Sequence, residues 1–227
     1  MSPQYIRTSH FDNPCTGTEE GEMLVRVTEN QTPLWIQATE VVKEKFRSSY
    51  KANVEPNPQY FALTLDVDER ILSCAGITFA DYRTLFSEQY LPEPIETILS
   101  RRFEKSIDRS NIAEIGNLIS HHLTAGIIMV NMIPLLAWCM GAHYLLCTVT
   151  PRVREMMESC QIVFEPLLVA DPERLADDSG KNWGSYYSKQ PITGFIRVDP
   201  QRSRFAALTL NTMFSQLPTD LPARAQP

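Results

Sequence analysis

The sequence predicts one domain of the α+β (mixed α/β) class, in which a twisted mixed sheet is flanked by helices. Two neighbouring β-rich segments form a hairpin pattern early in the chain. Further on, a strand, a helix, a strand and a helix alternate, and this order implies a right-handed parallel crossover. The 227 residues, 43% of them hydrophobic and 21% charged, suit one large domain. We place that domain at residues 22–200, between an irregular lead (1–21) and a partly disordered tail (201–227).

The first elements follow from local signals. Alternation over Glu22–Thr28 predicts a strand. Thr32 then fits an N-cap and Pro33 a first helical position, and the helical period continues to about Lys51.

The middle of the chain carries the hairpin and the most informative strand. Tyr60–Asp66 and Arg70–Ala80 are joined by a short polar tip. A helix is expected from about Pro94, and a strand over Ile112–His121.

The stretch from Ala125 to Ala142 is apolar enough to raise the question of a membrane span. Asn131 and Pro134 interrupt it, and it is barely long enough to cross a bilayer. A helix that is apolar on all sides is also typical of a protein centre, so we predict a buried helix. The later segments predict a strand, a helix and two strands: His143–Thr150, a helix from Pro151, Ile162–Ala170 and Ile192–Asp199. An antiparallel meander followed by a parallel crossover is the layout of acyltransferases of the GNAT type.

Composition narrows the functional classes. The formal net charge of −6 argues against a nucleic-acid partner. The five cysteines are widely spaced without a CxxC pair, which favours free thiols in a reducing compartment. The first residues lack the apolar core of a secretory signal, so we expect a cytoplasmic protein. His121 and His122 diverge as neighbours and have no further ligand at metal spacing, so we expect no metal site.

The strand "AEIGNLIS" carries a carboxylate and a carboxamide in an apolar context. Glu114, between Ile112 and Leu118 on one strand face, would be desolvated and would make a general base. Asn117 points to the other face unless the strand bulges, and Gly116 is the expected bulge position. A structural hydrogen-bond network around Glu114 is the competing explanation.

Three separated motifs resemble the thermostable hemolysin family of bacteria: "LFSEQYLPEPIE" (85–96), "EIGNLIS" (114–120) and "WGSYY" (183–187). The resemblance runs from about residue 22 to about residue 198. The family name implies lysis of red cells without identifying a mechanism.

The same region is similar, more distantly, to acyl-homoserine-lactone synthases, which have a GNAT-like core. Their core strand carries a Glu followed three residues later by an Arg, and Glu114 and Asn117 stand at those places here. This similarity implies transfer of an acyl group to an amine of a small metabolite. The co-substrate would be an acyl-CoA or a carrier-protein phosphopantetheine thioester, with no tightly bound cofactor. A GNAT-like sheet is also splayed beside this strand to admit the thioester.

The resemblance implies further site residues. The catalytic set is Glu114, Asn117 and, as a phenolic acid, Tyr186. The substrate-binding set comes from a loop over the amine, a pocket wall and the strand that lines the acyl pocket: Phe86, Glu88, Gln89, Tyr90, Trp183 and Thr148. Packing alone would equally explain the loop, and for the aromatic residues Trp183 and Tyr186 a packing role ranks ahead of a chemical one.

GNAT enzymes hold the coenzyme A pyrophosphate on a glycine-rich turn at a helix start. The corresponding stretch keeps only one of the glycines, and the cofactor-binding residues it implies are His121, Thr124, Ala125, Gly126 and Arg152. An acyl carrier protein needs less of this loop and could face Arg101, Arg102, Lys105 and Arg109, which otherwise form a solvated helix face. Cys147 is expected to be an inert buried thiol.

Two other functions stay open. One is a membrane-active hemolysin, which would need an inserting element that the sequence does not display. The other is a catalytically inactive GNAT-like module that binds a metabolite or a partner. A second copy of the chain also remains a candidate partner.

Overall fold

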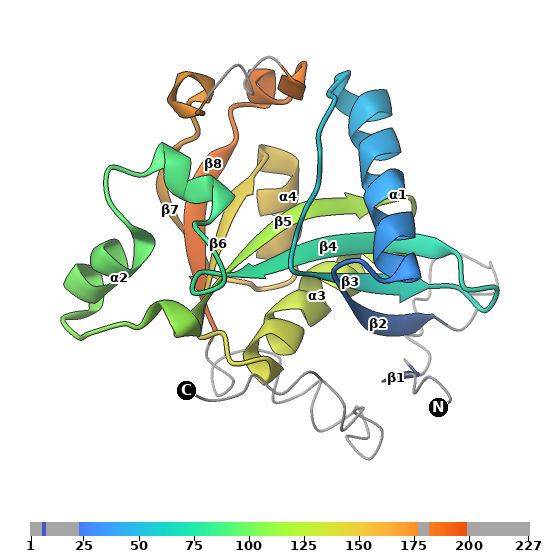
Figure 1. Cartoon of the computed structure of the whole chain (residues 1–227), viewed down its shortest axis with the longest axis horizontal. Helices are drawn as coiled ribbons and strands as arrows, with labels where there is room; N and C mark the ends of the chain where they lie inside the picture. Colours follow the sequence, from blue (N-terminus) through green and yellow to red (C-terminus); the bar gives the residue numbers. More distant parts are fainter. Residues whose placement is uncertain (1–5, 8–22, 177–181, 199–227) are drawn as a thin grey trace.

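The chain folds around one eight-stranded sheet with the strand order β1-β2-β3-β4-β5-β6-β8-β7. Figure 1 presents the computed structural model, which describes residues 6–7, 23–176 and 182–198. The strands are β1 (Ile6–Arg7), β2 (Leu24–Glu29), β3 (Tyr60–Leu65), β4 (Ile71–Phe79), β5 (Ile112–Ser120), β6 (Tyr144–Val149), β7 (Phe164–Val169) and β8 (Ile192–Arg197). Most of the predicted lead and the whole predicted tail lie outside the described residues.

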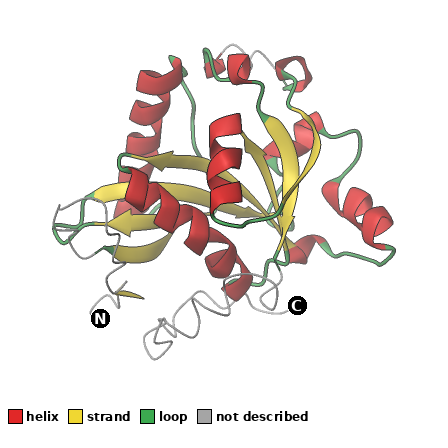
Figure 2. Ribbon diagram, turned by 180° about the vertical axis from the view of Figure 1, so that it is seen from behind, coloured by secondary structure: helices red, strands yellow, loops and turns green. Residues whose placement is uncertain are grey.

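Helices cover both faces of the sheet. They are α1 (Pro33–Tyr50), α2 (Ile95–Phe103), α3 (Leu123–Cys139) and α4 (Pro151–Ser159), with a short 3₁₀ turn η1 (Phe86–Tyr90) before α2. Buried side chains of α3 and α4 share one core cluster, whereas α1 and α2 contribute to clusters on the other face. The two views show α3 and α4 on the face opposite α1 (Figures 1 and 2).

The predicted elements are confirmed apart from their ends. Thr32 caps α1, since its hydroxyl accepts a hydrogen bond from the amide of Trp35 at 3.3 Å, and Pro33 stands at the helix start. β3 and β4 pair antiparallel as the predicted hairpin. The two-residue strand β1, which pairs with β2, was not predicted and lies within the predicted irregular lead.

The apolar stretch predicted as a buried helix is α3. Most of its side chains from Met129 to Ala137 are buried, although Pro134 lies inside the helix. In the part of the chain that the structure describes, no helix is long and apolar enough to cross a bilayer.

Among the strands that the structure describes, the crossover through α3 makes β5 and β6 a parallel pair, and the other paired strands run antiparallel. β8 enters between β6 and β7. The site predicted from sequence therefore lies at the centre of the sheet, where the meander meets the crossover.

Candidate active site

Glu114 is buried on β5 and binds the turn η1. Its Oε2 accepts the amide of Phe86 at 2.7 Å, and its Oε1 accepts both the amide and the hydroxyl of Ser87 at 2.8 and 2.6 Å. Burial raises the pKa of Glu114 above its ordinary value, and the donors from Ser87 and Phe86 oppose that rise. The carboxylate is thus desolvated, as its sequence context predicted, and it also anchors a loop.

A chain of hydroxyl groups leads away from this carboxylate. Ser87 Oγ lies 2.8 Å from the hydroxyl of Thr148 on β6, which lies 2.8 Å from the hydroxyl of Thr193 on β8. Ser87 and Thr193 are fully or almost fully buried, whereas Thr148 is partly exposed. The predicted substrate residue Thr148 is therefore connected to the predicted base through one serine.

β5 does bulge, but at Asn117 and not at the predicted Gly116. Gly76 of β4 pairs with Gly116, while Cys74 pairs with Ile119, so β5 has one extra residue between these pairs. Asn117 takes the left-handed conformation with φ 53°, in which a side-chain amide is better tolerated than most side chains. A Cβ at Gly116 would meet nothing within 4 Å, so this glycine is not required by a close contact.

The bulge changes which side chains share a face. Asn117 Nδ2 lies 3.1 Å from where a Cβ of Gly76 would be, on the α1 face of the sheet. Leu118 packs against the α3 cluster instead, so the prediction that it shares a face with Glu114 and Ile112 is wrong. The extra residue reverses the alternation and turns Asn117 to the side on which Glu114 lies.

β5 and β6 separate just beyond Glu114. Their parallel pairing covers Ile112–Ile115 against Tyr144–Cys147 and then stops. Beyond it, β5 stays paired with β4, and β6 stays paired with β8 through Thr148 and Val149. Beyond the pair of Ile115 and Cys147, the facing backbone edges of β5 and β6 are therefore not paired with each other. Thr148 is the first residue of β6 past that pair.

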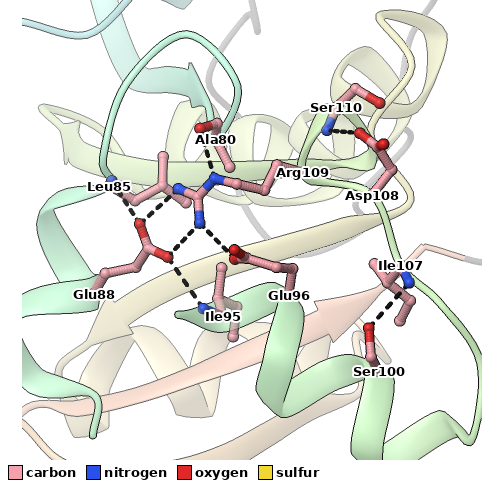
Figure 3. Close-up of polar contacts among 10 residues, drawn as sticks. All are labelled: Ala80, Leu85, Glu88, Ile95, Glu96, Ser100, Ile107, Asp108, Arg109 and Ser110. Atoms are coloured by element: carbon pink, nitrogen blue, oxygen red, sulfur yellow. Dashed lines mark hydrogen bonds and ion pairs between the residues drawn. The ribbon is translucent and has the colours of Figure 1, made fainter. Parts of the chain in front are cut away.

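Two residues predicted for binding, Glu88 and Arg109, form an ion pair with each other (Figure 3). Arg109 donates to both carboxylate oxygens of Glu88 at 2.8 Å and also to Glu96 and to the carbonyl of Ala80. Burial alone would raise the pKa of Glu88, but its hydrogen bonds, mainly from Arg109, hold it below the ordinary value. The guanidinium of Arg109 is thus bound by carboxylates and a carbonyl of its own chain, although its side chain remains 27% exposed. That it faces a carrier protein stays a prediction.

The other cations of the predicted carrier surface are also engaged. Arg101 pairs with Glu93, and Arg102 pairs with Glu165 and lies over the ring of Phe195. Lys105 lies over the ring of Tyr144. These side chains remain on the protein surface, where exposed ion pairs contribute little to stability.

An aromatic cluster joins the segment 182–190 to η1 and to α1. The ring of Trp183 lies 5.4 Å from that of Phe86 and 5.1 Å from that of Tyr186. The hydroxyls of Tyr90 and Tyr187 are 2.5 Å apart. The contact between Phe86 and Trp183 brings the predicted loop and the predicted pocket wall together. Phe86 is partly exposed and forms the outer edge of this cluster.

Gln89 and Tyr186 contact the backbone on either side of this cluster. The side chain of Gln89 donates to the carbonyl of Phe86 at 3.2 Å and accepts the amide of Ala176 at 3.0 Å. The phenol of Tyr186 donates to the carbonyl of Thr148 at 3.3 Å, where β6 leaves β5. Burial raises the pKa of Tyr186, so this phenol is a hydrogen-bond donor at neutral pH.

The residues predicted for a cofactor phosphate gather at the start of α3. Ala125 and Gly126 are buried, Thr124 is partly buried, and His121 is exposed. A Cβ at Gly126 would lie 3.1 Å from the Cβ of Ser120, so the glycine lets the helix start lie close to the end of β5. The pKa of His121 is lowered by partial burial and by the nearby cation of Lys45, so its imidazole is predominantly neutral at neutral pH.

Arg152 projects from the start of α4 and is exposed. Burial raises the pKa of Tyr50, the last residue of α1, and the charge of Arg152 opposes that rise. Because α4 begins two residues after β6 ends, Arg152 follows the end of β6 at which Thr148 lies.

Sequence reasoning missed Ser87 and Thr193, although both touch the chain that starts at Glu114. Ser87 lies inside the motif of residues 85–96, in which the charged and aromatic side chains carry the site prediction. A signal existed for Thr193: it is a lone polar residue in the apolar run of β8, where it pairs with Thr148. Cys147 is buried as expected, and burial raises the pKa of its thiol to about 12, which disfavours the thiolate.

Among residues 6–7, 23–176 and 182–198, no group of three metal-ligating side chains could hold an ion. The four cysteines in these ranges are free thiols.

Comparison with known proteins decides the family. The sequence profile described as thermostable hemolysin matches residues 28–201. The chain belongs to the thermostable hemolysin family. No curated protein matches the sequence of this family member.

Solved structures similar to this thermostable hemolysin family member show the acyl-CoA N-acyltransferase-like fold. FeeM, an N-acyl amino acid synthase from uncultured soil microbes, has a TM-score of 0.56 at 12% identity over 85% of this chain and 100% of its own. The acyl-homoserine-lactone synthase LasI has a TM-score of 0.52 at 8% identity over 78% and 90%. BjaI, a CoA-dependent acyl-homoserine-lactone synthase solved with SAM and isopentyl-CoA, has a TM-score of 0.51 at 9% identity over 79% and 85%. At such identities the likeness establishes the fold.

Proposed function

We propose that the protein transfers an acyl group from a thioester to an amine of a small metabolite. The separation of β5 and β6 carries the proposal. Two strands that are parallel for four pairs and then diverge present facing backbone edges, and unpaired backbone groups require hydrogen-bond partners. An extended chain that contains amides, such as the pantetheine arm of coenzyme A or of a carrier protein, can bond to such edges as an added strand does.

The chemistry needed at the end of that arm has matching groups nearby. An ammonium must lose a proton before it attacks a thioester carbonyl, and Glu114 is a desolvated carboxylate next to the separation. Tyr186 is the candidate donor to the leaving thiolate, because its phenol lies at Thr148 where the strands part. Asn117, which the bulge turns to this face, is the candidate donor to the developing oxyanion.

The remaining predicted residues take peripheral places. The first turn of α3 offers the backbone amides of Thr124 and Ala125 to an anion, and Arg152 stands on the neighbouring helix. Gly126 would contribute by its lack of a side chain, since its own amide is bonded to the carbonyl of His122. Phe86 and Trp183 offer an apolar wall for the acceptor. This arrangement suits coenzyme A or a carrier-borne phosphopantetheine as donor, and a small amine as acceptor.

The proposal also accounts for the name of the family. An acyl chain on a small polar amine makes an amphiphile, and each buried methylene adds about 0.8 kcal/mol to membrane affinity. Lysis would then come from the product and not from the protein. If so, a complete reaction mixture should release dye from vesicles, whereas the protein without thioester should not.

The experiment is a screen of acyl-CoAs and acylated carrier proteins against primary amines, followed by thiol release and mass spectrometry of the product. The wild-type protein should release thiol only when an amine is present, and Glu114→Gln should lose that activity while it stays folded. Glu165→Gln on β7 is the matched control, since it also removes a strand carboxylate but lies away from the separation. Unchanged turnover in Glu114→Gln would remove Glu114 from the mechanism, and a wild type inactive with every pair would contradict acyl transfer.

A further inference from the structure

The carboxylate of Glu114 is covered by the turn that it anchors. Three donors from two consecutive residues of η1 occupy its two oxygens, and the residue is only 8% exposed. An amine that entered between β5 and β6 would have to displace η1 to touch this carboxylate. Direct contact between Glu114 and a substrate is therefore sterically unfavourable.

The hydroxyl chain offers another route out. When Glu114 is ionised, the hydroxyl of Ser87 must donate to it, because a carboxylate only accepts hydrogen bonds. The oxygen of Ser87 then accepts from Thr148, and the oxygen of Thr148 accepts from Thr193. The ionisation of Glu114 therefore sets the direction of every hydrogen in the chain.

Thr148 is the exit of this chain. It is partly exposed, while Ser87 and Thr193 are 2% and 0% exposed. It is also the first residue of β6 beyond the last pair with β5. Its oxygen has two lone pairs, of which Thr193 takes one, so one acceptor position is left for a ligand.

We infer that Thr148 and Ser87 form a proton relay, through which the ammonium of the acceptor substrate loses its proton to Glu114. This inference rests on the proposed acyl transfer. The ammonium N–H bond breaks as Thr148 Oγ1 takes its proton. In the same step the hydroxyl proton of Thr148 moves to Ser87 Oγ, and the hydroxyl proton of Ser87 moves to Glu114 Oε1. The products are a neutral amine, two unchanged hydroxyls and a protonated Glu114.

The relay assigns different roles to the two hydroxyls. Thr148 contacts the substrate nitrogen, whereas Ser87 acts between Thr148 and Glu114 and also keeps η1 in place through its amide. Three other ionisable groups interact electrostatically with this carboxylate. The charge of Glu88 contributes to the raised pKa of Glu114, and the charge of Glu114 contributes to the raised pKa values of Tyr90 and Cys147. None of them is a member of the hydrogen-bonded chain.

The test compares Thr148→Val, which removes the hydroxyl at nearly constant shape, with Thr148→Ser, which keeps it. Thr64→Val is the matched control, because Thr64 is a buried strand threonine that also contacts a serine hydroxyl, at Ser73. Each protein is assayed with two acceptors: an alkylamine that is an ammonium at the assay pH, and a weakly basic amine that is already neutral. Unfolding curves check that every variant is folded.

With the ammonium acceptor, Thr148→Val should lower kcat/KM roughly a hundredfold, the size typical of a lost acid–base step. Thr148→Ser and Thr64→Val should keep most of the activity. With the neutral acceptor, Thr148→Val should approach the wild-type rate, because no proton has to leave the nitrogen before attack.

Two results would overturn the relay alone: full activity of Thr148→Val with the ammonium acceptor, or an equal loss with both acceptors, which would indicate a structural role. A wild type that transfers acyl groups to neither acceptor would instead contradict the proposed function, and the relay with it.

Discussion

Arg109 binds Glu88 through both terminal guanidinium nitrogens, each 2.8 Å from a carboxylate oxygen. This pair ties the loop before β5 to the turn η1, because Glu88 also accepts the amides of Leu85 and Ile95. The turn η1 is therefore fixed by two carboxylates: its own Glu88, which accepts the amide of Leu85, and Glu114 of β5, which accepts the amides of Phe86 and Ser87.

Loss of the arginine should destabilise the protein. In Arg109→Ala the side chain of Glu88, only 7% exposed, would lose its charged partner. We expect a loss of about 2–4 kcal/mol in the free energy of unfolding, less than for a fully buried pair because Arg109 is partly exposed. Arg101→Ala removes the mostly exposed pair with Glu93 and should cost at most about 1 kcal/mol. Equal losses in urea unfolding would contradict the structural role given to Arg109.

The two carboxylates should give opposite pH dependences of stability. The pKa of Glu88 is lowered in the folded protein, so its contribution is present above the unfolded-state pKa of about 4.3 and is lost as pH falls through the folded value. The pKa of Glu114 is raised, so its contribution is present below about 4.3 and is lost as pH rises through the folded value.

Urea unfolding of the wild type, Glu88→Gln and Glu114→Gln across this pH range separates the two effects. Glu88→Gln should flatten the loss of stability on the acid side. Glu114→Gln should flatten the decline on the side toward neutral pH. Parallel pH curves for all three proteins would show that neither carboxyl has the shift described.

The bulge on β5 should depend on the residue at 117. Asn117→Val places a β-branched side chain at φ 53° and should cost about 1–2 kcal/mol, whereas Asn117→Gly removes that strain. Gly116→Ala is the control, since its Cβ would enter open space. Chemical denaturation should rank Asn117→Val as the least stable of the three. Destabilisation by Gly116→Ala would instead support a bulge at Gly116, the position predicted from the sequence.

Docking of the aromatic segment on α1 should depend on Gly184. A Cβ there would lie 2.1 Å from the carbonyl oxygen of Tyr50, and φ is +51°. Gly184→Ala should therefore weaken the packing of Trp183 and shift its fluorescence toward that of a solvated indole. Gly141→Ala, also at positive φ but with nothing within 4 Å, should show strain without that spectral change. Identical spectra for both variants would contradict the close approach.

The sequence was sufficient to predict most elements of the fold, because their signals are local. Thr32 and Pro33 mark the start of α1 by capping chemistry, and the hairpin of β3 and β4 follows from alternation. The position of β8 between β6 and β7 could not be predicted from such local signals. Strand order depends on contacts between distant segments, and no local pattern in Ile192–Arg197 records its neighbours.

The candidate site shows the same division. Glu114 stood out as a carboxylate in an apolar strand, and its burial followed from that context. The bulge was predicted at the wrong residue because glycine is permissive at many positions, whereas only the register with β4 shows which residue is extra. Ser87 carried no signal of its own, since its role arises only when the loop folds onto β5.

The position of β8 also bears on how the protein is made. Among the described strands, β7 pairs with β8 alone and β6 pairs only with β5 and β8. This sheet therefore cannot be completed until Ile192–Arg197, one of the last described segments of the chain, has been synthesised. During translation the meander β2–β5 can form early, while β6 and β7 emerge with open edges. Those edges are exposed to other chains until β8 arrives, and a truncation before Ile192 would leave them so.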